Sequence, residues 1–196
     1  MKIIQNFFVL EGLDGSGTTT QLELLKDKTF NLPVWTTFEP TNSEVGLLLR
    51  RALRKEISLP PTTLVHLFAA DRDIHVQEIS EKACERIVVC DRYISSSYAY
   101  QSLSCSWDLI MRVNEDFPLP QDLLFLEVSP QICAQRRAAR GAAQELFEEV
   151  ELQVQIDQNY RKALAEAEKR GCRVHILDGT RAKEVVHKEI CKILSL

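Results

Sequence analysis

The sequence lacks a long apolar run, closely paired cysteines and an excess of basic residues. A membrane-spanning helix needs roughly 20 consecutive apolar residues, whereas the N-terminal apolar run is short and is interrupted by Gln5 and Asn6. We therefore expect neither a secretory leader nor a membrane span. The six cysteines show no C-x-x-C spacing, which favours free thiols in a reducing cytoplasm over disulfides or a zinc site.

The charge balance limits the kind of partner that the protein can bind. A formal net charge of −4 argues against binding to a nucleic-acid polymer, because such binding normally needs a basic surface. A small anionic ligand is still compatible with this charge, since a pocket can gather arginines on an acidic molecule. The length of 196 residues, without an internal repeat or a low-complexity linker, predicts one domain with a substantial core.

Short apolar or β-branched runs alternate with helical patterns along the whole chain. The runs lie at residues 3–10, 34–38, 86–90, 123–128 and 173–177. Continuously apolar strands separated by helices are typical of a parallel sheet with helices on both faces. Polar residues follow the first three runs, and ligands of such sheets bind beyond the carboxyl ends of the strands. The pattern predicts an α/β fold with its site at this edge.

A glycine-rich segment, residues 12–19 (GLDGSGTT), follows the first predicted strand and precedes a helical pattern. Strand, glycine loop and helix together form the context of a phosphate-binding loop, in which backbone amides hold phosphate oxygens. The usual loop has the pattern G-x-x-x-x-G-K-[ST], but Thr18 occupies the position of the lysine. The alternative interpretation is a strand-to-helix turn that binds nothing.

Three further groups of residues carry candidate chemistry, and each has a structural alternative. Phe68 and Arg72 are four apart on one helix face, which also suits a core aromatic covered by an arginine. Asp91 and Arg92 end the third strand, where they suit a phosphate site or a surface ion pair. Three arginines before Gly141 suit either a lid over a nucleotide or a solvated basic face.

Five motifs, in order along the chain, together resemble the thymidylate kinase family. They are GLDGSG, TFEPTNSEVG, LFAADR, DRYISSSYAYQ and PQICAQRRAARG. The resemblance implies a P-loop NTPase-type three-layer sandwich, with a five-stranded parallel sheet, helices on both faces and a short lid. It further implies one nucleoside-monophosphate-kinase-like domain over residues 1–196, with the lid at about residues 136–150. The implied activity is transfer of the ATP γ-phosphate to dTMP for dTTP synthesis, with Mg²⁺, in a cytoplasmic homodimer.

The resemblance also assigns roles to individual residues. Those implied at the reacting groups are Asp14, Asp91, Arg92, Arg137 and Arg140. Those implied at ATP are Gly12, Leu13, Asp14, Gly15, Ser16, Gly17, Thr18, Thr19 and Arg136. Those implied at dTMP are Asp14, Glu39, Pro40, Phe68, Arg72, Arg92, Ser96, Tyr100 and Gln101, with Phe68 stacked on thymine. Thr19 and Asp91 would serve Mg²⁺, largely through the nucleotide phosphates.

The chain departs from the family pattern at positions that usually carry positive charge. Thr18 replaces the loop lysine, Phe38 replaces an arginine that is common before Glu-Pro, and Leu146 stands where relatives often have an arginine. Our hypothesis is that Arg137 or Arg140 supplies the missing charge when the lid closes. Two rival interpretations stay open: a nucleotide-binding protein that has lost catalysis, and a related kinase with another deoxypyrimidine acceptor.

Overall fold

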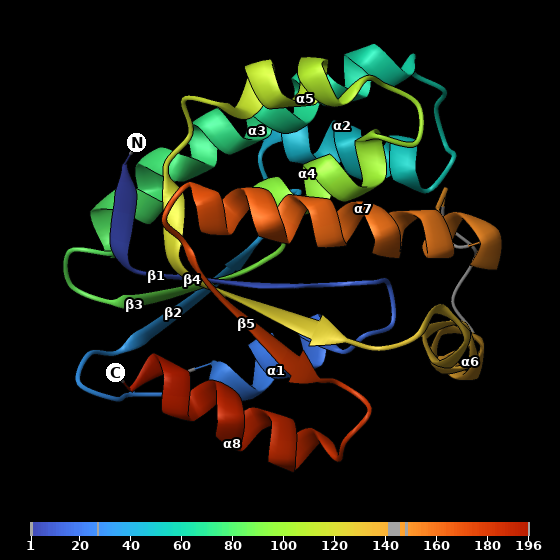
Figure 1. The fold of residues 1–196 in the computed structure, drawn as a ribbon. Coiled ribbons are helices and arrows are strands. Elements are labelled where there is room, and N and C mark those ends of the chain that lie inside the picture. The colour runs from blue at the N-terminus through green and yellow to red at the C-terminus, as the bar shows by residue number, and fades with distance from the viewer. Residues whose placement is uncertain (1, 27, 141–145, 148, 196) are drawn as a thin grey trace.

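A computed structural model describes residues 2–26, 28–140, 146–147 and 149–195. Its five strands form one parallel sheet in the order β2-β3-β1-β4-β5 (Figure 1). They are β1 Ile3–Gly12, β2 Val34–Phe38, β3 Ile87–Asp91, β4 Leu119–Glu127 and β5 Arg173–Asp178. The five predicted strands are therefore confirmed, although β4 begins before the predicted residue 123.

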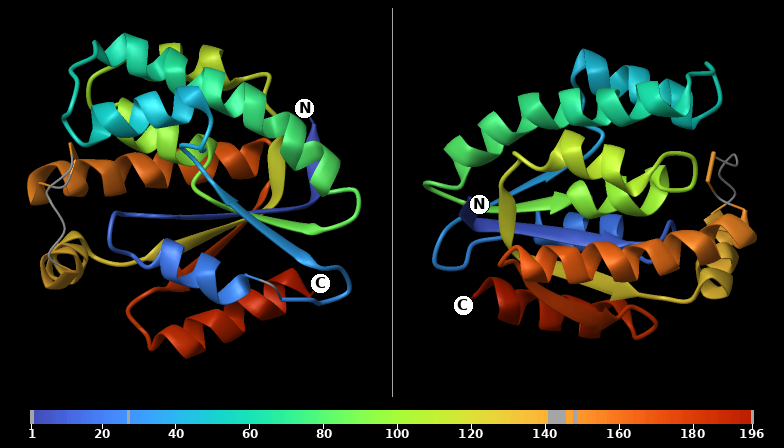
Figure 2. Two further views of the ribbon diagram at one scale, coloured as in Figure 1. Left: turned by 180° about the vertical axis from the view of Figure 1, so that it is seen from behind. Right: turned by 45° about the horizontal axis from the view of Figure 1, so that its top comes forward.

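Helices cover both faces of the sheet, so the predicted three-layer α/β fold is confirmed (Figures 1 and 2). The described helices are α1 Thr18–Leu25, α2 Glu44–Leu53, α3 Pro61–Lys82, α4 Ile94–Gln101, α5 Trp107–Asn114, α6 Pro130–Arg140, α7 Val150–Lys169 and α8 Lys183–Leu194. Helices α1 and α8 cover one face, and α3, α4, α5 and α7 cover the other (Figure 2).

The central strand β1 shows why the sheet must be covered on both faces. Successive side chains of a strand point to opposite faces. Phe7 and Val9 accordingly belong to the core cluster under α4 and α7, whereas Phe8 and Leu10 pack with α1 and α8. Each of these four side chains is buried, which a single helical layer could not achieve.

Local signals explain where several helices begin. Ser43 caps α2, since its hydroxyl accepts from the Gly46 amide at 3.0 Å. Helix α7 begins at Val150 and carries Glu151 in its first turn, and Ser106 caps α5. Part of the predicted lid, residues 141–145 and 148, lies outside the described residues.

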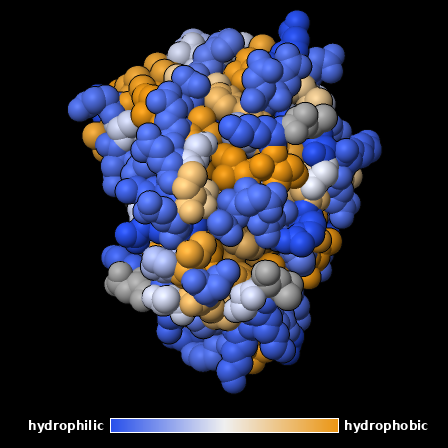
Figure 3. All heavy atoms as spheres, turned by 90° about the vertical axis from the view of Figure 1, so that its left-hand side faces the viewer, coloured by the Kyte–Doolittle hydropathy of each residue, from blue (hydrophilic) through white to orange (hydrophobic). Residues whose placement is uncertain are grey.

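The parallel strands direct their carboxyl ends toward one edge, where the loops after β1, β2 and β3 meet. This is the edge at which the sequence predicts the site. The molecule's opposite end, seen in Figure 3, shows hydrophobic residues gathered between hydrophilic regions. No helix within the described residues is long and apolar enough to cross a membrane.

Candidate active site

The loop between β1 and α1 has the backbone geometry of an anion cradle. Gly15 and Gly17 adopt φ angles of +100° and +109°, which side-chain-bearing residues rarely adopt. A Cβ on Gly15 would also lie 2.7 Å from the Cys133 carbonyl oxygen. No side chain caps the start of α1, so its first amide groups can donate to an external anion.

The first residues of α1 differ sharply in exposure. Thr18, at the position of the usual lysine, is 5% exposed, whereas Thr19 is exposed. The Thr19 hydroxyl donates to Asp91 Oδ2 at 2.7 Å, which joins α1 to the end of β3. Asp91 Oδ1 is buried and has no hydrogen-bond partner among the described residues. A hydroxyl and an unpartnered carboxylate oxygen are ligand types that suit Mg²⁺.

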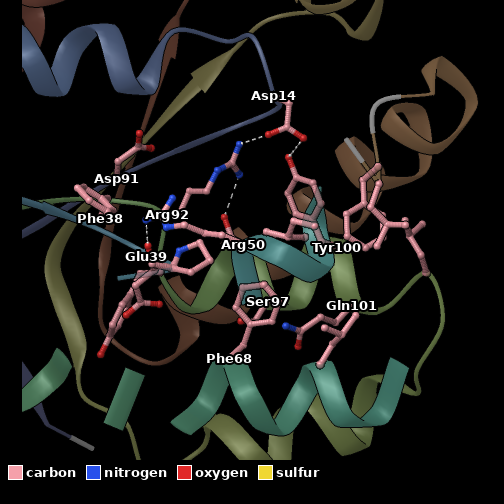
Figure 4. A pocket seen from close by; sticks show the side chains of 18 of the residues that line it. Asp14, Phe38, Glu39, Arg50, Phe68, Asp91, Arg92, Ser97, Tyr100 and Gln101 are labelled. Atoms are coloured by element: carbon pink, nitrogen blue, oxygen red, sulfur yellow. Dashed lines mark hydrogen bonds and ion pairs between the residues drawn. The ribbon is translucent and has the colours of Figure 1, made fainter. Parts of the chain in front are cut away.

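Arg92 follows Asp91 and lies at the centre of the site (Figure 4). Its backbone has a φ of 71°, and its amide donates to the Leu10 carbonyl at 2.9 Å. Nη2 donates to Asp14 Oδ1 at 2.6 Å, while Nη1 donates to the hydroxyls of Ser96 and Tyr160 at 3.1 and 3.0 Å. The guanidinium is thus held on one side by a partly exposed carboxylate and on the other by two hydroxyls.

Asp14 connects the phosphate loop to the part of the site around Tyr100. Its Oδ2 accepts from the Tyr100 hydroxyl at 3.0 Å and from Gln153 at 3.2 Å. Figure 4 shows Arg92 and Tyr100 directed toward this carboxylate. Burial raises the pKa of Tyr100 well above its ordinary value, so this phenol remains a hydrogen-bond donor at neutral pH.

Arg72 is a buried member of an ion pair, which excludes the interpretation that it merely shields an aromatic residue from solvent. The residue is 1% exposed, and its Nε and Nη2 donate to Glu39 Oε2 at 3.0 and 2.7 Å. Nη2 also donates to Ser97, and Nη1 donates to the Asn114 side chain. The positive charge is therefore fixed in place before any ligand binds.

The opposite oxygen of Glu39 extends this buried chain. Glu39 Oε1 lies 3.0 Å from His75 Nδ1, and His75 Nε2 lies 2.7 Å from the Thr37 hydroxyl. The neighbouring loop is held by Asp71, whose carboxylate accepts from the Thr41 amide at 2.7 Å and from the Ser43 hydroxyl at 2.6 Å. The loop after β2 is thus fastened to α3 by charged groups on adjacent positions, 71 and 72.

One cavity of about 820 Å³ joins these groups. The residues predicted from the sequence that line it are Asp14, Thr19, Glu39, Pro40, Phe68, Arg72, Asp91, Arg92, Ser96, Tyr100 and Gln101. Phe68 and Gln101 lie near each other in its wall (Figure 4), and Gln101 Oε1 has no partner among the described residues. The cavity therefore brings together all predicted acceptor-binding residues.

The arginines of α6 contact the phosphate loop from outside this cavity. Arg136 donates to the carbonyls of Ser16 and Gly179 at 3.1 and 3.0 Å, and Arg137 donates to the Asp14 carbonyl. These contacts place both side chains against the loop, unlike a solvated basic face. The side chain of Arg140 lies outside the described residues.

Several residues of the site were missed by sequence reasoning, Ser97 beside Arg72 among them. Arg50 lines the cavity, donates to the Pro40 carbonyl and lies 5.0 Å from the Phe38 ring centroid. Gln153 and Tyr160 reach the loop from α7, and Glu11 precedes Gly12. An acidic residue at the end of an apolar strand is a signal that could have identified Glu11. The helix residues carried no comparable signal.

Glu11 is the most perturbed carboxyl group near the loop. It is fully buried, and burial raises its pKa to about 7 against the lowering effects of Ser96, Arg92 and Tyr160. Burial would lower the pKa of Arg92, but Tyr100, Asp14 and other nearby acidic groups raise it, so the guanidinium stays charged. The site thus holds a permanent cation next to a carboxyl group that titrates near neutral pH.

Comparison with known proteins gives one consistent result. The family model described as thymidylate kinase matches residues 10–190. Two curated relatives with provisional thymidylate kinase names come from Treponema pallidum and Methanococcus aeolicus. They are 36% and 37% identical, each covering 97% of this chain, with 95% and 96% of their own lengths matched. The solved thymidylate kinase structure from Candida albicans covers 97% of this chain and 91% of its own, with a TM-score of 0.78 and 21% identity.

Proposed function

Because the chain belongs to the thymidylate kinase family, we propose that it transfers the γ-phosphate of ATP to dTMP, which yields dTDP. The observation that carries this proposal is the single cavity that joins the Thr19–Asp91 pair to the pocket of Phe68 and Arg72. Arg92 lies between the two parts, where a monophosphate would meet a donor phosphate. The geometry therefore suits transfer between two bound nucleotides.

The base pocket favours an acceptor with a carbonyl group at its edge. A guanidinium has five N–H groups, and the protein partners of Arg72 use four of them. The remaining N–H can donate to the O4 carbonyl of thymine, but it would oppose the amino group of cytosine. Phe68 supplies an aromatic face for stacking on the same base.

The sugar and phosphate would lie between Asp14, Tyr100 and Arg92. Asp14 would accept from the 3′-hydroxyl, and Tyr100 would crowd a ribose 2′-hydroxyl. Arg92 would bind the acceptor phosphate, for which its planar donor pair is well suited. This arrangement would hold the attacking phosphate oxygen without moving the buried side of the guanidinium.

The donor side would use backbone amides, a metal ion and arginines. Thr19 and Asp91 would hold Mg²⁺, which neutralises charge that develops during phosphoryl transfer. Arg136 would lie against adenine, while Arg137 and Arg140 would serve the ATP phosphates in place of the absent lysine. Catalysis would then rest mainly on positioning and electrostatic stabilisation.

The proposal extends to a cytoplasmic homodimer, as the family resemblance implies. Leu47 and Ile74 are large apolar side chains that are 45% and 52% exposed, on α2 and α3. Burial of such residues between two copies would remove apolar surface from water. Sedimentation of the protein at several concentrations distinguishes a dimer from a monomer.

A binding protein without catalysis is the second candidate, and Thr18 is the observation that favours it. The buried Thr18 side chain leaves the donor site without its usual lysine. Thr19 and Asp91 favour the enzyme, because nucleotide binding alone does not require a metal site.

The test is steady-state ADP release with ATP, Mg²⁺ and dTMP, beside dUMP, dCMP, the ribose analogue and thymidine. We expect turnover with dTMP and little with dCMP. Tight nucleotide binding without turnover, and turnover restored by Thr18→Lys, would instead establish a disabled kinase. Equal turnover with another deoxypyrimidine monophosphate would transfer the assignment to a related kinase.

A further inference from the structure

Glu11 is a buried acid that the proposed reaction does not use directly. It ends the apolar part of β1, immediately before the phosphate loop, and it is 0% exposed. Oε1 accepts from the backbone amides of Tyr93 and Ser96 at 3.0 and 3.2 Å. Oε2 accepts from the hydroxyls of Ser96 and Tyr160 at 2.6 and 3.0 Å. The carboxyl group is thus surrounded by donors on both oxygens.

The same two hydroxyls are the partners of Arg92 on its buried side. Nη1 of Arg92 donates to Ser96 Oγ and Tyr160 Oη at 3.1 and 3.0 Å. A hydroxyl has only one hydrogen to donate. When Ser96 and Tyr160 direct theirs to Glu11, both must present lone pairs to the guanidinium. Glu11 therefore keeps the hydrogens of both hydroxyls turned away from Arg92, so that their lone pairs face the guanidinium.

The outer side of Arg92 is held differently. Nη2 binds Asp14, whose side chain is 31% exposed, and the guanidinium lies 5.1 Å from the centroid of the Tyr100 ring. An incoming phosphate can approach Nη2 through the cavity, whereas Nη1 is engaged by hydroxyls from α4 and α7. The buried hydrogen bonds are therefore the ones that can fix the orientation of Arg92.

We propose that Glu11 is a positioning residue, which acts through Ser96 and Tyr160 to hold Arg92 in the orientation that binds the acceptor phosphate. This inference rests on the proposed function, since it assumes that Arg92 meets the phosphate of dTMP. Stability alone does not account for Glu11, because a carboxylate loses its hydration on burial and a neutral residue of the same shape avoids this cost.

The decisive substitution is Glu11→Gln, which keeps the size of the side chain. The new amide oxygen would accept from the two backbone amides, so the new NH₂ group would face Ser96 and Tyr160. Each hydroxyl would then accept from this NH₂ group with one of its two lone pairs, and its own hydrogen could turn toward Arg92, which cannot accept it. Tyr160→Phe removes one of the two hydroxyls while it keeps the ring.

The measurement is calorimetric binding of dTMP and of thymidine, which lacks the phosphate, to each protein. We expect Glu11→Gln and Tyr160→Phe to weaken dTMP binding about tenfold, as the loss of one charge-assisted contact implies. Thymidine binding and the KM for ATP should not change, and the KM for dTMP should rise with little change in kcat. Glu189→Gln on α8 and Tyr98→Phe, which stacks on Trp107 outside the cavity, are the matched controls.

The outcomes separate this inference from the proposed function. Equal losses for dTMP and thymidine, or undiminished dTMP binding in both variants, would overturn the positioning role alone. A native protein that binds dTMP no more tightly than thymidine would overturn the acceptor assignment as well. Urea unfolding of Glu11→Gln completes the test, because a purely structural role predicts lower stability and a positioning role does not.

Discussion

The proposed acceptor side and the proposed donor side of the site hold their positive charges in different ways. On the acceptor side, Arg72 and Arg92 are fixed by side-chain partners from several elements. On the donor side, Thr18 replaces the usual cation, and Arg136 and Arg137 donate to backbone carbonyls of the loop. Under the proposed function, the groups that recognise the acceptor are therefore already fixed in the folded chain, whereas the donor would rely on backbone amides and on the arginines of α6.

The largest expected effect is on the acceptor side, from Arg72→Met. This substitution leaves Glu39 buried without its cation, so we expect a loss of about 3–5 kcal/mol in the free energy of unfolding. Urea unfolding measures the change. Adding Glu39→Gln should recover most of the stability, while dTMP binding stays weak. A double variant as unstable as the single one would show that the ion pair is not the cause.

The pH dependence of stability should reveal the perturbed carboxyl group behind the acceptor site. Because the pKa of folded Glu11 is raised to about 7, the folded protein keeps this proton after the unfolded chain has lost it. Stability should therefore fall as pH rises from roughly 4.5 to 7, by about 3 kcal/mol. Glu11→Gln should remove this component, so urea unfolding of both proteins at pH 5 and pH 8 checks it. The same stability difference at both pH values would contradict the raised pKa.

On the donor side, replacing Arg137 and Arg140 together by Met should lower kcat about 10- to 100-fold with little effect on dTMP affinity. Cations near the donor phosphates stabilise charge in the transition state, and the acceptor pocket does not contain Arg137. Single-turnover kinetics and calorimetry measure the two quantities. Arg51→Met on exposed α2 is the control. Normal turnover in the double variant would exclude these arginines as the substitute for lysine.

The smallest expected effect is a gain, from Thr18→Lys. Restoring one charge-assisted contact is worth about 1.5–3 kcal/mol, but groups that already cover the charge would reduce the gain to a few-fold in kcat. Thr18→Met has similar length without charge and serves as the control. If both variants have the same kcat, the missing charge does not limit the reaction. This result would show that the donor side, like the acceptor side, already has the positive charge that it needs.

The sequence predicts much of this fold because its signals are local. The strand–glycine–helix order around Gly15 and Gly17, and the four-residue spacing of Phe68 and Arg72, are readable without tertiary structure. The proline pair at the start of α3 is equally local, since Pro60 is the N-cap and Pro61 is the first residue of the helix.

The rest depends on contacts between distant parts of the chain. Tyr160 lies on α7, yet its hydroxyl reaches Gly12, 148 positions away. A buried tyrosine on an amphipathic helix has the same local pattern whether it packs or binds, so only the docking of α7 reveals its role. Similarly, the pairing of Glu39 with Arg72 joins positions 33 apart that no periodicity connects.

The backbone of Arg92 has a consequence for protein engineering. Side chains other than those of asparagine and aspartate usually cost roughly 1–2 kcal/mol in a left-handed backbone, so Lys55 and Arg92 are the obvious positions for stabilising glycines. At exposed Lys55 such a change would remove no side chain that lines the cavity, but at Arg92 it would delete the guanidinium at the centre of the proposed acceptor site. Selection for thermal stability alone would thus accept Arg92→Gly, which under the proposed function would abolish turnover.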